Sequence, residues 1–247
     1  MRGSGKRNRS AFGTLAEEAV DTIRNRILDM TLEPGSRIDA PLLMKQFKLS
    51  RTPAREALNR LAAEGLVVLH ANRGAYVRRL DFEDVQALFD IYFVEERMLG
   101  HFCNFGDAQL VADLERIHRE HQAATRAKHH LDITRLNSEF HLRIAKSSRN
   151  LWLQDFVYRI HNHFRQLAFI IYQLESRLAN VLERQMKHIV EEHTQIIAAI
   201  RREDRERLIQ LLVSHAQRAQ DRLVARIGAS RGSGFALPSR GSRRRPG

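Results

Sequence analysis

The sequence lacks the features that would place it in a membrane or give it a disulfide framework. It has one cysteine, Cys103, which cannot form a disulfide within the chain. No apolar run approaches the roughly 20 residues that a membrane helix needs, and no basic and then apolar signal segment stands at its start. We therefore expect a cytoplasmic protein without membrane contact. Cys103 lies in an apolar helical stretch, which predicts a buried thiol rather than a nucleophile.

Internal repeats at a fixed period are also absent, which argues against a solenoid. A chain of 247 residues suits two domains, and an apolar content of 43% is enough to bury a core in each. The first part of the chain mixes helical and strand patterns, whereas residues 81–227 show helical patterns without strand alternation. The sequence thus predicts a mainly α protein whose second domain is an all-α antiparallel helical bundle.

The formal net charge of +12 is concentrated at the two ends of the chain. Residues 1–14 carry four basic and no acidic side chains, and residues 226–247 carry six basic and no acidic ones. Residues 15–80 carry 11 basic and 8 acidic side chains, so charge alone does not identify a nucleic-acid-binding domain there. Composition predicts a disordered basic arm over residues 1–14 and a disordered basic tail over residues 228–247. These tails either strengthen nonspecific DNA binding by counterion release or only aid solubility.

Residues 49–58, LSRTPAREAL, have the pattern of a turn followed by the start of a short helix. Ser50 or Thr52 can cap this helix, and the proline that follows suits its first turn. Arg51 and Arg55 are four residues apart and therefore project from one face. Arginines in this position can contact phosphates or donate to the O6 and N7 atoms of guanine. In isolation the segment fits an ordinary amphipathic helix with two solvated arginines equally well.

The flanking segments complete a winged helix-turn-helix pattern. A short helix over residues 40–47 precedes the turn, and a helical pattern over residues 15–30 lies upstream. After the recognition helix, residues 66–69 and 75–79 predict two strands joined by a basic turn with Arg73 near its tip. A second helix of this kind enters the major groove, and the ribbon forms a wing beside it.

Residues 15–80 resemble the winged helix-turn-helix domain of the GntR family of bacterial transcription regulators. The resemblance rests on the ordered motifs Leu32-x-Pro34-Gly35-x-Arg37-Ile38, Leu49-Ser50-Arg51-Thr52-Pro53-x-Arg55-Glu56-Ala57-Leu58-x-Arg60-Leu61, Glu64-Gly65-Leu66 and Asn72-Arg73-Gly74-Ala75. It implies a homodimer on double-stranded DNA with a palindromic operator. The DNA-contacting residues that it implies lie in the recognition helix and the wing: Ser50, Arg51, Thr52, Arg55, Arg73 and Gly74. The second helix begins Asp39-Ala40-Pro41, unlike the Glu-rich or basic start usual in the family, so we assign it no DNA contact.

The second domain is predicted to contain a series of antiparallel helices that could enclose a pocket. We place them near residues 82–103, 107–128, 132–147, 150–173, 175–201 and 204–227. Plausible caps precede several of these helices, namely Asp81, Asp107, Asp132 and Asp204. Gly106 and Asn150 are the expected breaks.

Histidines on the apolar faces of the predicted helices are the candidate residues for metal binding or catalysis in this domain. His141 shares a face with Asn137, one turn earlier, while His193 and His215 each line up with isoleucine or leucine residues. A histidine on such a stripe can be a hydrogen-bonded core residue. Three of them on separate helices can instead converge on one cation, because imidazole is a common zinc ligand. Spacing alone leaves both readings open.

The same segments resemble the FadR-type C-terminal domain, or FCD domain, of the GntR family. The motifs are Leu136-Asn137-x-x-Phe140-His141-x-x-Ile144-Ala145, Glu192-His193-x-x-Ile196-Ile197 and the later His215. In metal-binding members an Asp and three His residues hold a divalent ion under an effector pocket, and a small carboxylate completes the coordination. The resemblance implies His141, His193 and His215 as ligands of zinc or nickel, with the neutral amide of Asn137 in place of the Asp.

The effector cannot be copied from the family, because Tyr92 stands where many members have an effector-binding arginine. Arg97, Arg143 and Arg165 are other candidates for pairing with a carboxylate, or are solvated or structural arginines. We expect the remaining histidines to lie in a polar loop or on the surface: His118, His121, His129, His130, His161, His163 and His188.

The sequence therefore predicts a ligand-responsive, homodimeric transcription regulator, a repressor, that senses a small organic acid. Two alternatives stay open. One is a metal-dependent enzyme, which would need a general base, and we expect Glu192 and Glu139 to belong to other helix faces. The other is a constitutive DNA-binding dimer with a histidine-lined but empty core.

Overall fold

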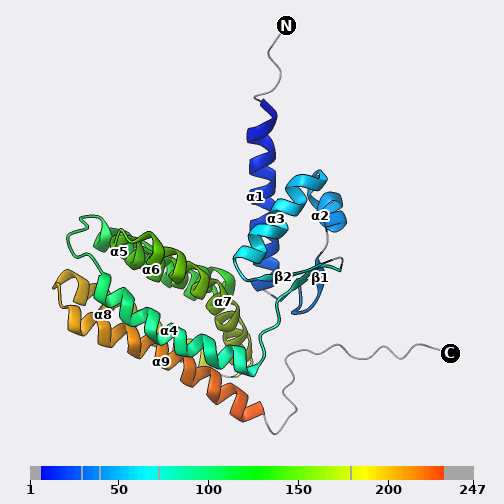
Figure 1. Cartoon of the computed structure of the whole chain (residues 1–247). Coiled ribbons are helices and arrows are strands. Elements are labelled where there is room, and N and C mark those ends of the chain that lie inside the picture. The colour runs from blue at the N-terminus through cyan, green and yellow to red at the C-terminus, as the bar shows by residue number, and fades with distance from the viewer. Residues whose placement is uncertain (1–6, 29, 39, 72, 179, 231–247) are drawn as a thin grey trace.

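The computed structural model describes residues 7–28, 30–38, 40–71, 73–178 and 180–230. Figure 1 shows two bodies, a small mixed domain and a larger helical domain. The first contains α1 (Arg7–Leu28), β1 (Arg37–Ile38), α2 (Ala40–Phe47), α3 (Arg51–Ala63), β2 (Val67–His70) and β3 (Gly74–Val77). The second contains α4 (Phe82–Phe102), α5 (Leu110–Ala127), α6 (His130–Ser147), α7 (Leu151–Ser176), α8 (Val181–Arg201) and α9 (Arg205–Ser230).

The first domain is a winged helix-turn-helix. Its antiparallel sheet has the strand order β1-β3-β2, and Val67 pairs with Val77 across the wing. Leu43 of α2, Leu61 of α3 and Ile27 of α1 are fully buried in one core with the inward faces of the strands. The predicted helix over residues 40–47 and both wing strands are confirmed within one or two residues.

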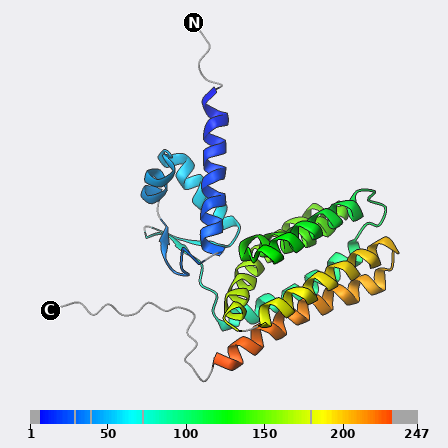
Figure 2. The same ribbon diagram turned by 180° about the vertical axis from the view of Figure 1, so that it is seen from behind.

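The helical domain has a second, separate core. In Figures 1 and 2, α5, α6 and α7 lie on one side and α4, α8 and α9 on the other. The closest neighbours are α4 with α9, α5 with α6, and α6 with α7. Phe89, Tyr92 and Phe140 are its largest fully buried side chains. Within the described residues, no helix combines the length and apolar character needed to cross a membrane.

The structure corrects the predicted limits of the two basic ends. α1 begins at Arg7, so the part of the arm from residue 7 onward is helical rather than disordered. α9 continues to Ser230, past the predicted end at residue 227. Residues 1–6 and 231–247, which make up the rest of both predicted tails, lie outside the described residues, as do Asp39 and Asn72.

Two of the predicted caps are confirmed. Asp81 accepts a hydrogen bond from the backbone of Asp84 at 2.8 Å and forms a capping box, and Asp204 accepts from the backbone of Arg207 at 2.9 Å. The prediction of Asp132 was wrong, because α6 begins at His130 and Asp132 lies within its first turn. Asn150, predicted only as a break, caps α7 by accepting from two backbone N–H groups. Ser50 occupies the cap position of α3, but its side chain makes no cap hydrogen bond to a described residue. The hydroxyl of Ser50 is therefore left free to meet another partner.

Candidate DNA-reading surface and metal centre

The recognition helix α3 has one buried and one exposed face. Ala54, Ala57 and Leu61 are fully buried, whereas Arg51 and Arg55 are exposed. The apolar face packs on α1 and α2, which turns the two arginines outward. This arrangement separates the residues that hold the helix from those that can touch DNA.

Arg51 and Arg55 share a hollow of about 490 Å³ with Gly74 of the wing. The start of α2, including Pro41, lines the other side of this hollow. Ser50, Thr52 and Arg73 are exposed but are not among its lining residues. Recognition helix and wing therefore form one concave surface.

The wing is held in shape close to its tip. Gly74 has a φ of +92°, which a residue with a side chain adopts only with strain. The hydroxyl of Tyr76 donates to the carbonyl of Arg73 at 3.1 Å, and its ring meets His70 edge-on. These contacts fix the backbone of the wing turn at Arg73.

In the helical domain, His141 of α6, His193 of α8 and His215 of α9 come together in the core. Their relative exposures are 0%, 0% and 5%, respectively. One ring nitrogen from each lies within 4.8 Å of the others. Sequence spacing left open whether these stripes converge, and the structure brings all three to one point.

One of the three histidines is oriented by a hydrogen bond to a buried carboxylate, and a second lies beside another carboxylate. Nδ1 of His215 forms a hydrogen bond with Oε2 of Glu192 at 2.8 Å. Nδ1 of His141 lies 2.8 Å from Oε1 of Glu96, but this contact does not have hydrogen-bond geometry. A histidine that gives its Nδ1–H to a carboxylate presents Nε2 as a metal ligand. The prediction that Glu192 belongs to another helix face was wrong, because α8 turns Glu192 toward α9.

The electrostatics of the cluster favour neutral imidazole at His193. Burial, and then the neighbouring His121 and His215, lower the pKa of His193 well below its ordinary value. Burial also lowers the pKa of His215, but the hydrogen bond and charge of Glu192 outweigh it and raise the pKa overall. Burial raises the pKa of Glu192, but His215 and Arg218 lower it overall.

Asn137 has an amide oxygen suited to the fourth position. Its Oδ1 is buried and has no hydrogen-bond partner among the described residues. Asn137 lines a small cavity of about 30 Å³ together with Tyr92, Glu192 and His215. A space of this size is enough for a water molecule, which needs at least roughly 10–15 Å³ by the same measure. Of the three imidazoles, only that of His215 lines this cavity. The convergence of the three imidazoles fits a divalent cation, and the cavity with Asn137 adjoins it at His215.

Of the predicted effector residues, Tyr92 lies at this cavity and is 1% exposed. Its ring stacks on Phe164 with centroids 3.8 Å apart. Burial, and then the charges of Glu96 and Glu95, raise the pKa of Tyr92 well above its ordinary value. Tyr92 therefore stays a neutral hydrogen-bond donor beside the cluster.

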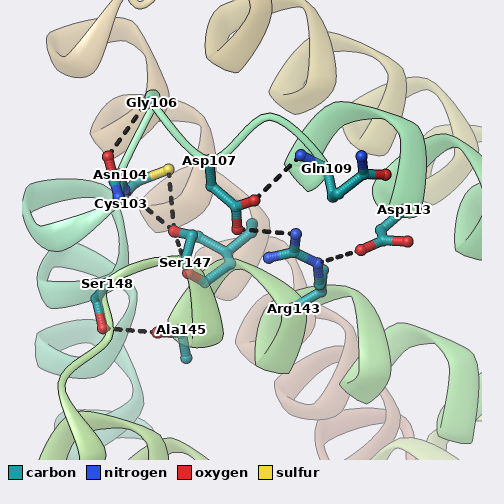
Figure 3. Close-up of polar contacts among 11 residues, drawn as sticks. Cys103, Asn104, Gly106, Asp107, Gln109, Asp113, Arg143, Ala145, Ser147 and Ser148 are labelled. Atoms are coloured by element: carbon teal, nitrogen blue, oxygen red, sulfur yellow. Dashed lines mark hydrogen bonds and ion pairs between the residues drawn. The ribbon is translucent and has the colours of Figure 1, made fainter.

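Arg143 is engaged by two carboxylates, as Figure 3 shows. Its guanidinium pairs with Asp107 at 2.8 Å and with Asp113 at 2.7 Å. Because Arg143 follows His141 by two residues on α6, the two side chains point to opposite sides of the helix. Arg143 connects α6 to the start of α5 and has a structural role.

The same close-up includes Cys103, which is buried and faces Ser147 (Figure 3). Burial raises the pKa of Cys103 to about 11, so its thiol stays protonated. This agrees with the predicted buried thiol.

Arg165 also lies away from the cavity lining. Burial, and then the charges of Arg24 and Arg135, lower its pKa to about 10. The arginines that do line the cavity are Arg218 and Arg222 of α9. Both share a helix face with His215, at three and seven residues beyond it, so the sequence contained a signal that we did not use.

The prediction of surface positions was wrong for His118, His121 and His161. They are 8%, 0% and 1% exposed, respectively. His118 and His121 lie on the same buried face of α5 as Leu114 and Ile117, and both rings lie against His193. His188 and His129 are exposed, as expected. The rule that isolated histidines are surface residues fails where the helix stripe is otherwise apolar.

Comparison with known proteins agrees with both domains. Residues 15–77 match the family model of bacterial regulatory proteins of the gntR family, and residues 91–218 match the FCD domain. The Nta operon transcriptional regulator of Aminobacter aminovorans is 30% identical over 195 residues, covering 77% of this chain and 86% of that protein. The gluconate operon transcriptional repressor of Bacillus licheniformis is 27% identical and covers 77% of each chain.

Solved structures share the fold. McbR/YncC of E. coli superposes with a TM-score of 0.72 at 21% identity, covering 86% of this chain and 98% of the other. A regulator from Rhodococcus sp. RHA1 gives a TM-score of 0.68 at 20% identity, with the same two coverages. The chain thus belongs to the GntR family of bacterial transcription regulators, with a DNA-binding winged helix-turn-helix domain and an FCD effector-binding domain.

Proposed function

We propose that this regulator is a cytoplasmic repressor that binds a palindromic operator as a homodimer and responds to a small carboxylate. DNA is contacted by Ser50, Arg51, Thr52, Arg55, Arg73 and Gly74. His141, His193 and His215 hold a divalent metal, zinc or nickel, with the oxygen of Asn137 beside them. The observation that carries the sensing half is the convergence of three buried imidazoles on one point. The name of the gluconate operon repressor supports repression and makes gluconate the first effector to test.

The metal, when bound, supplies a positive centre that attracts an anionic group. Asn137 is neutral, so it does not offset this charge as an Asp would. Arg218 lines the small cavity that contains Asn137, is half exposed, and donates a hydrogen bond to Glu192. We assign to Arg218 the second contact with an incoming carboxylate, because it can reach the cavity from solvent.

The present cavity is too small for a sugar acid. Its volume of about 30 Å³ accommodates one water or ion. An effector that binds here must therefore displace side chains of the cavity lining, and we assign the response to this displacement. A ligand changes DNA affinity only through a difference in its affinity for the two arrangements.

Helix α7 connects the cluster to the DNA-binding domain. His161 of α7 lies with its ring 4.9 Å from that of His141. Two residues earlier, Nη1 of Arg159 donates to the carbonyl of Ala63 at 3.0 Å, at the end of the recognition helix α3. Figure 1 shows α7 beside the lower end of the first domain.

Replacing Arg159 with alanine is expected to weaken this coupling. The change removes the hydrogen bond to Ala63 but no residue of the cluster or of the DNA-reading surface. Couplings of this kind are typically ~1–3 kcal/mol, so the effector-induced change in operator affinity should fall severalfold. Fluorescence anisotropy with and without effector measures it. An unchanged response would exclude this route.

The metal site is tested by zinc binding to the full chain. We expect His193→Ala to remove zinc from the cluster, because it deletes one of three imidazole ligands. His129→Ala is the control, since His129 is exposed and does not line the cavity. Equal zinc content in both variants would refute the site.

The effector half is tested separately, by operator affinity in a panel of small carboxylates beginning with gluconate. We expect at least one to reduce affinity. If operator binding is specific and no carboxylate changes it, the protein is a constitutive DNA-binding regulator without an effector. The enzyme reading finds little support, since Glu192 is engaged by both His215 and Arg218 and is not a free base.

A further inference from the structure

The helical domain has a large cavity that is separate from the small one beside the histidine cluster. Its volume is about 800 Å³, within the range of roughly 300–1,000 Å³ usual for small-molecule sites. It lies between the end of α5 with the start of α6 and the end of α7 with the start of α8. None of its lining residues also lines the cavity that contains Asn137 and His215. A ligand here would therefore occupy a different place from the effector proposed above.

One part of the lining is apolar. Ile133 of α6 and Met186 of α8 are 1% and 3% exposed, respectively. Leu182 and Val190 lie one turn before and one turn after Met186, so three apolar residues form a stripe along α8. Apolar side chains around an open space are stabilised when the apolar part of a ligand removes them from water. This stripe favours a ligand with an apolar portion.

The lining also carries an excess of positive charge. Its cations are Arg126 and Lys128, at the end of α5, and Lys187 of α8, all exposed. Lys187 pairs with Glu183 at 3.0 Å, whereas Arg126 and Lys128 form no ion pair with another described residue. Burial lowers the pKa of His130, so its imidazole is neutral. Three cations and one carboxylate leave a net charge of +2 among these lining residues.

The start of α8 adds a partial positive charge to the same cavity. Leu182 and Glu183, in the first turn of α8, are lining residues. The cap residue Asn180 makes no side-chain hydrogen bond to this turn. The first backbone N–H groups of a helix have no acceptor within the helix and attract anions. Together with the two unpaired cations, this turn favours an anionic group on the ligand.

We propose that this cavity binds an amphipathic organic anion, a carboxylate attached to an apolar chain. The carboxylate is held at Arg126 and Lys128, and the chain lies along Leu182, Met186 and Val190. A polar anion such as gluconate would leave this stripe without an apolar partner. The inference goes beyond the proposed function, because the binding involves neither the metal centre nor the cavity beside Asn137.

The test is isothermal titration calorimetry of the full chain, with octanoate as the probe and a chelator present. We expect saturable binding whose affinity increases roughly fourfold for each methylene added from butanoate to octanoate, as expected for burial of the chain. 1-Octanol has the same chain without the charge. It should bind roughly tenfold more weakly, because the charge-assisted hydrogen bonds are lost.

Two variants separate the charged and apolar contacts. Replacing Arg126 and Lys128 together with glutamine should weaken octanoate binding roughly tenfold and leave 1-octanol binding unchanged. Leu182→Gln should weaken the binding of both ligands. Arg119→Gln is the matched control, because Arg119 is exposed on α5 and does not line the cavity, and it should bind like the wild type. Circular dichroism reports folding, and the double variant alters only exposed side chains.

The outcomes also distinguish this site from the metal centre. An absence of saturable binding, equal affinity for octanoate and 1-octanol, or unchanged octanoate binding in the double variant would overturn the site. Octanoate binding that requires Zn²⁺ and is lost in His193→Ala would place the anion at the histidine cluster instead. Octanoate binding by a protein that holds no zinc would support this site while refuting the metal centre.

Discussion

Replacing Arg51 and Arg55 together with alanine should remove specific operator binding while leaving the fold intact. Both side chains are exposed on α3 and line the hollow shared with the wing, so neither contributes to the core. A well-placed arginine contact to guanine is worth about 1–3 kcal/mol. Losing two such contacts corresponds to a decrease in affinity of roughly 30-fold or more.

Fluorescence anisotropy at fixed salt, with a duplex selected from a random library, measures the loss. Arg60→Ala is the control on the same helix, because Arg60 pairs with Glu56 and Glu17 and is not in the DNA-contacting set. We expect the control to bind within about threefold of the wild type, which is the range of a surface change. Equal binding by the double variant and the wild type would exclude α3 as the reading element.

The second large effect concerns acid stability of the metal-free protein and depends on His121. Histidine in an unfolded chain titrates near pH 6.5. In the folded protein burial, and then His118 and His215, lower the pKa of His121 to about 3. Between these pH values only the unfolded chain binds the proton. The free energy of unfolding therefore decreases as pH falls from 6.5 toward 3.

The expected loss from His121 alone is about 2 kcal/mol between pH 6.5 and pH 5, at about 1.4 kcal/mol per pH unit. The lowered pKa values of His161 and His193 act in the same direction. The raised pKa values of His215 and Glu95 oppose it. A comparison of variants is therefore sharper than the wild-type curve alone.

His121→Leu isolates the effect, because leucine has a similar volume and does not titrate. Urea unfolding is followed by circular dichroism with chelator present. The free energy of unfolding should decrease less in this variant than in the wild type between pH 6.5 and pH 5. His188→Leu is the control, since His188 is exposed on α8. If the free energy of unfolding depends on pH equally in His121→Leu and the wild type, His121 is protonated to the same extent in the folded and unfolded states, which would contradict the prediction.

Sequence patterns identified the architecture well because they are local. The cap, turn and apolar spacing around α3 determine that helix regardless of what the rest of the chain does, and α2 and the wing follow the same logic. The helical domain was also predicted, since each helix has its own apolar stripe. α1 was truncated in the prediction because a basic, glycine-containing start reads as a tail, although helix α1 begins at Arg7.

Tertiary partners were the part that sequence could not supply. His141, His193 and His215 were named from their stripes and from family resemblance. The carboxylates behind them were missed, because Glu96 and Glu192 read as polar positions until α4 and α8 are packed. Burial of His118 and His121 follows from α5 lying against α8, a contact between segments far apart in the chain. Arg218 and Arg222 line the cavity and lie on the same face of α9 as His215. This shared face would have identified them as effector candidates ahead of Arg143 and Arg165.

The most direct test of the sensing account is a crystal structure of the full chain grown with Zn²⁺, with diffraction collected at the zinc absorption edge. The account predicts an anomalous peak with nitrogen ligands from His141, His193 and His215 at about 2.0–2.1 Å. A zinc-saturated crystal in which these three imidazoles surround no anomalous peak would contradict it.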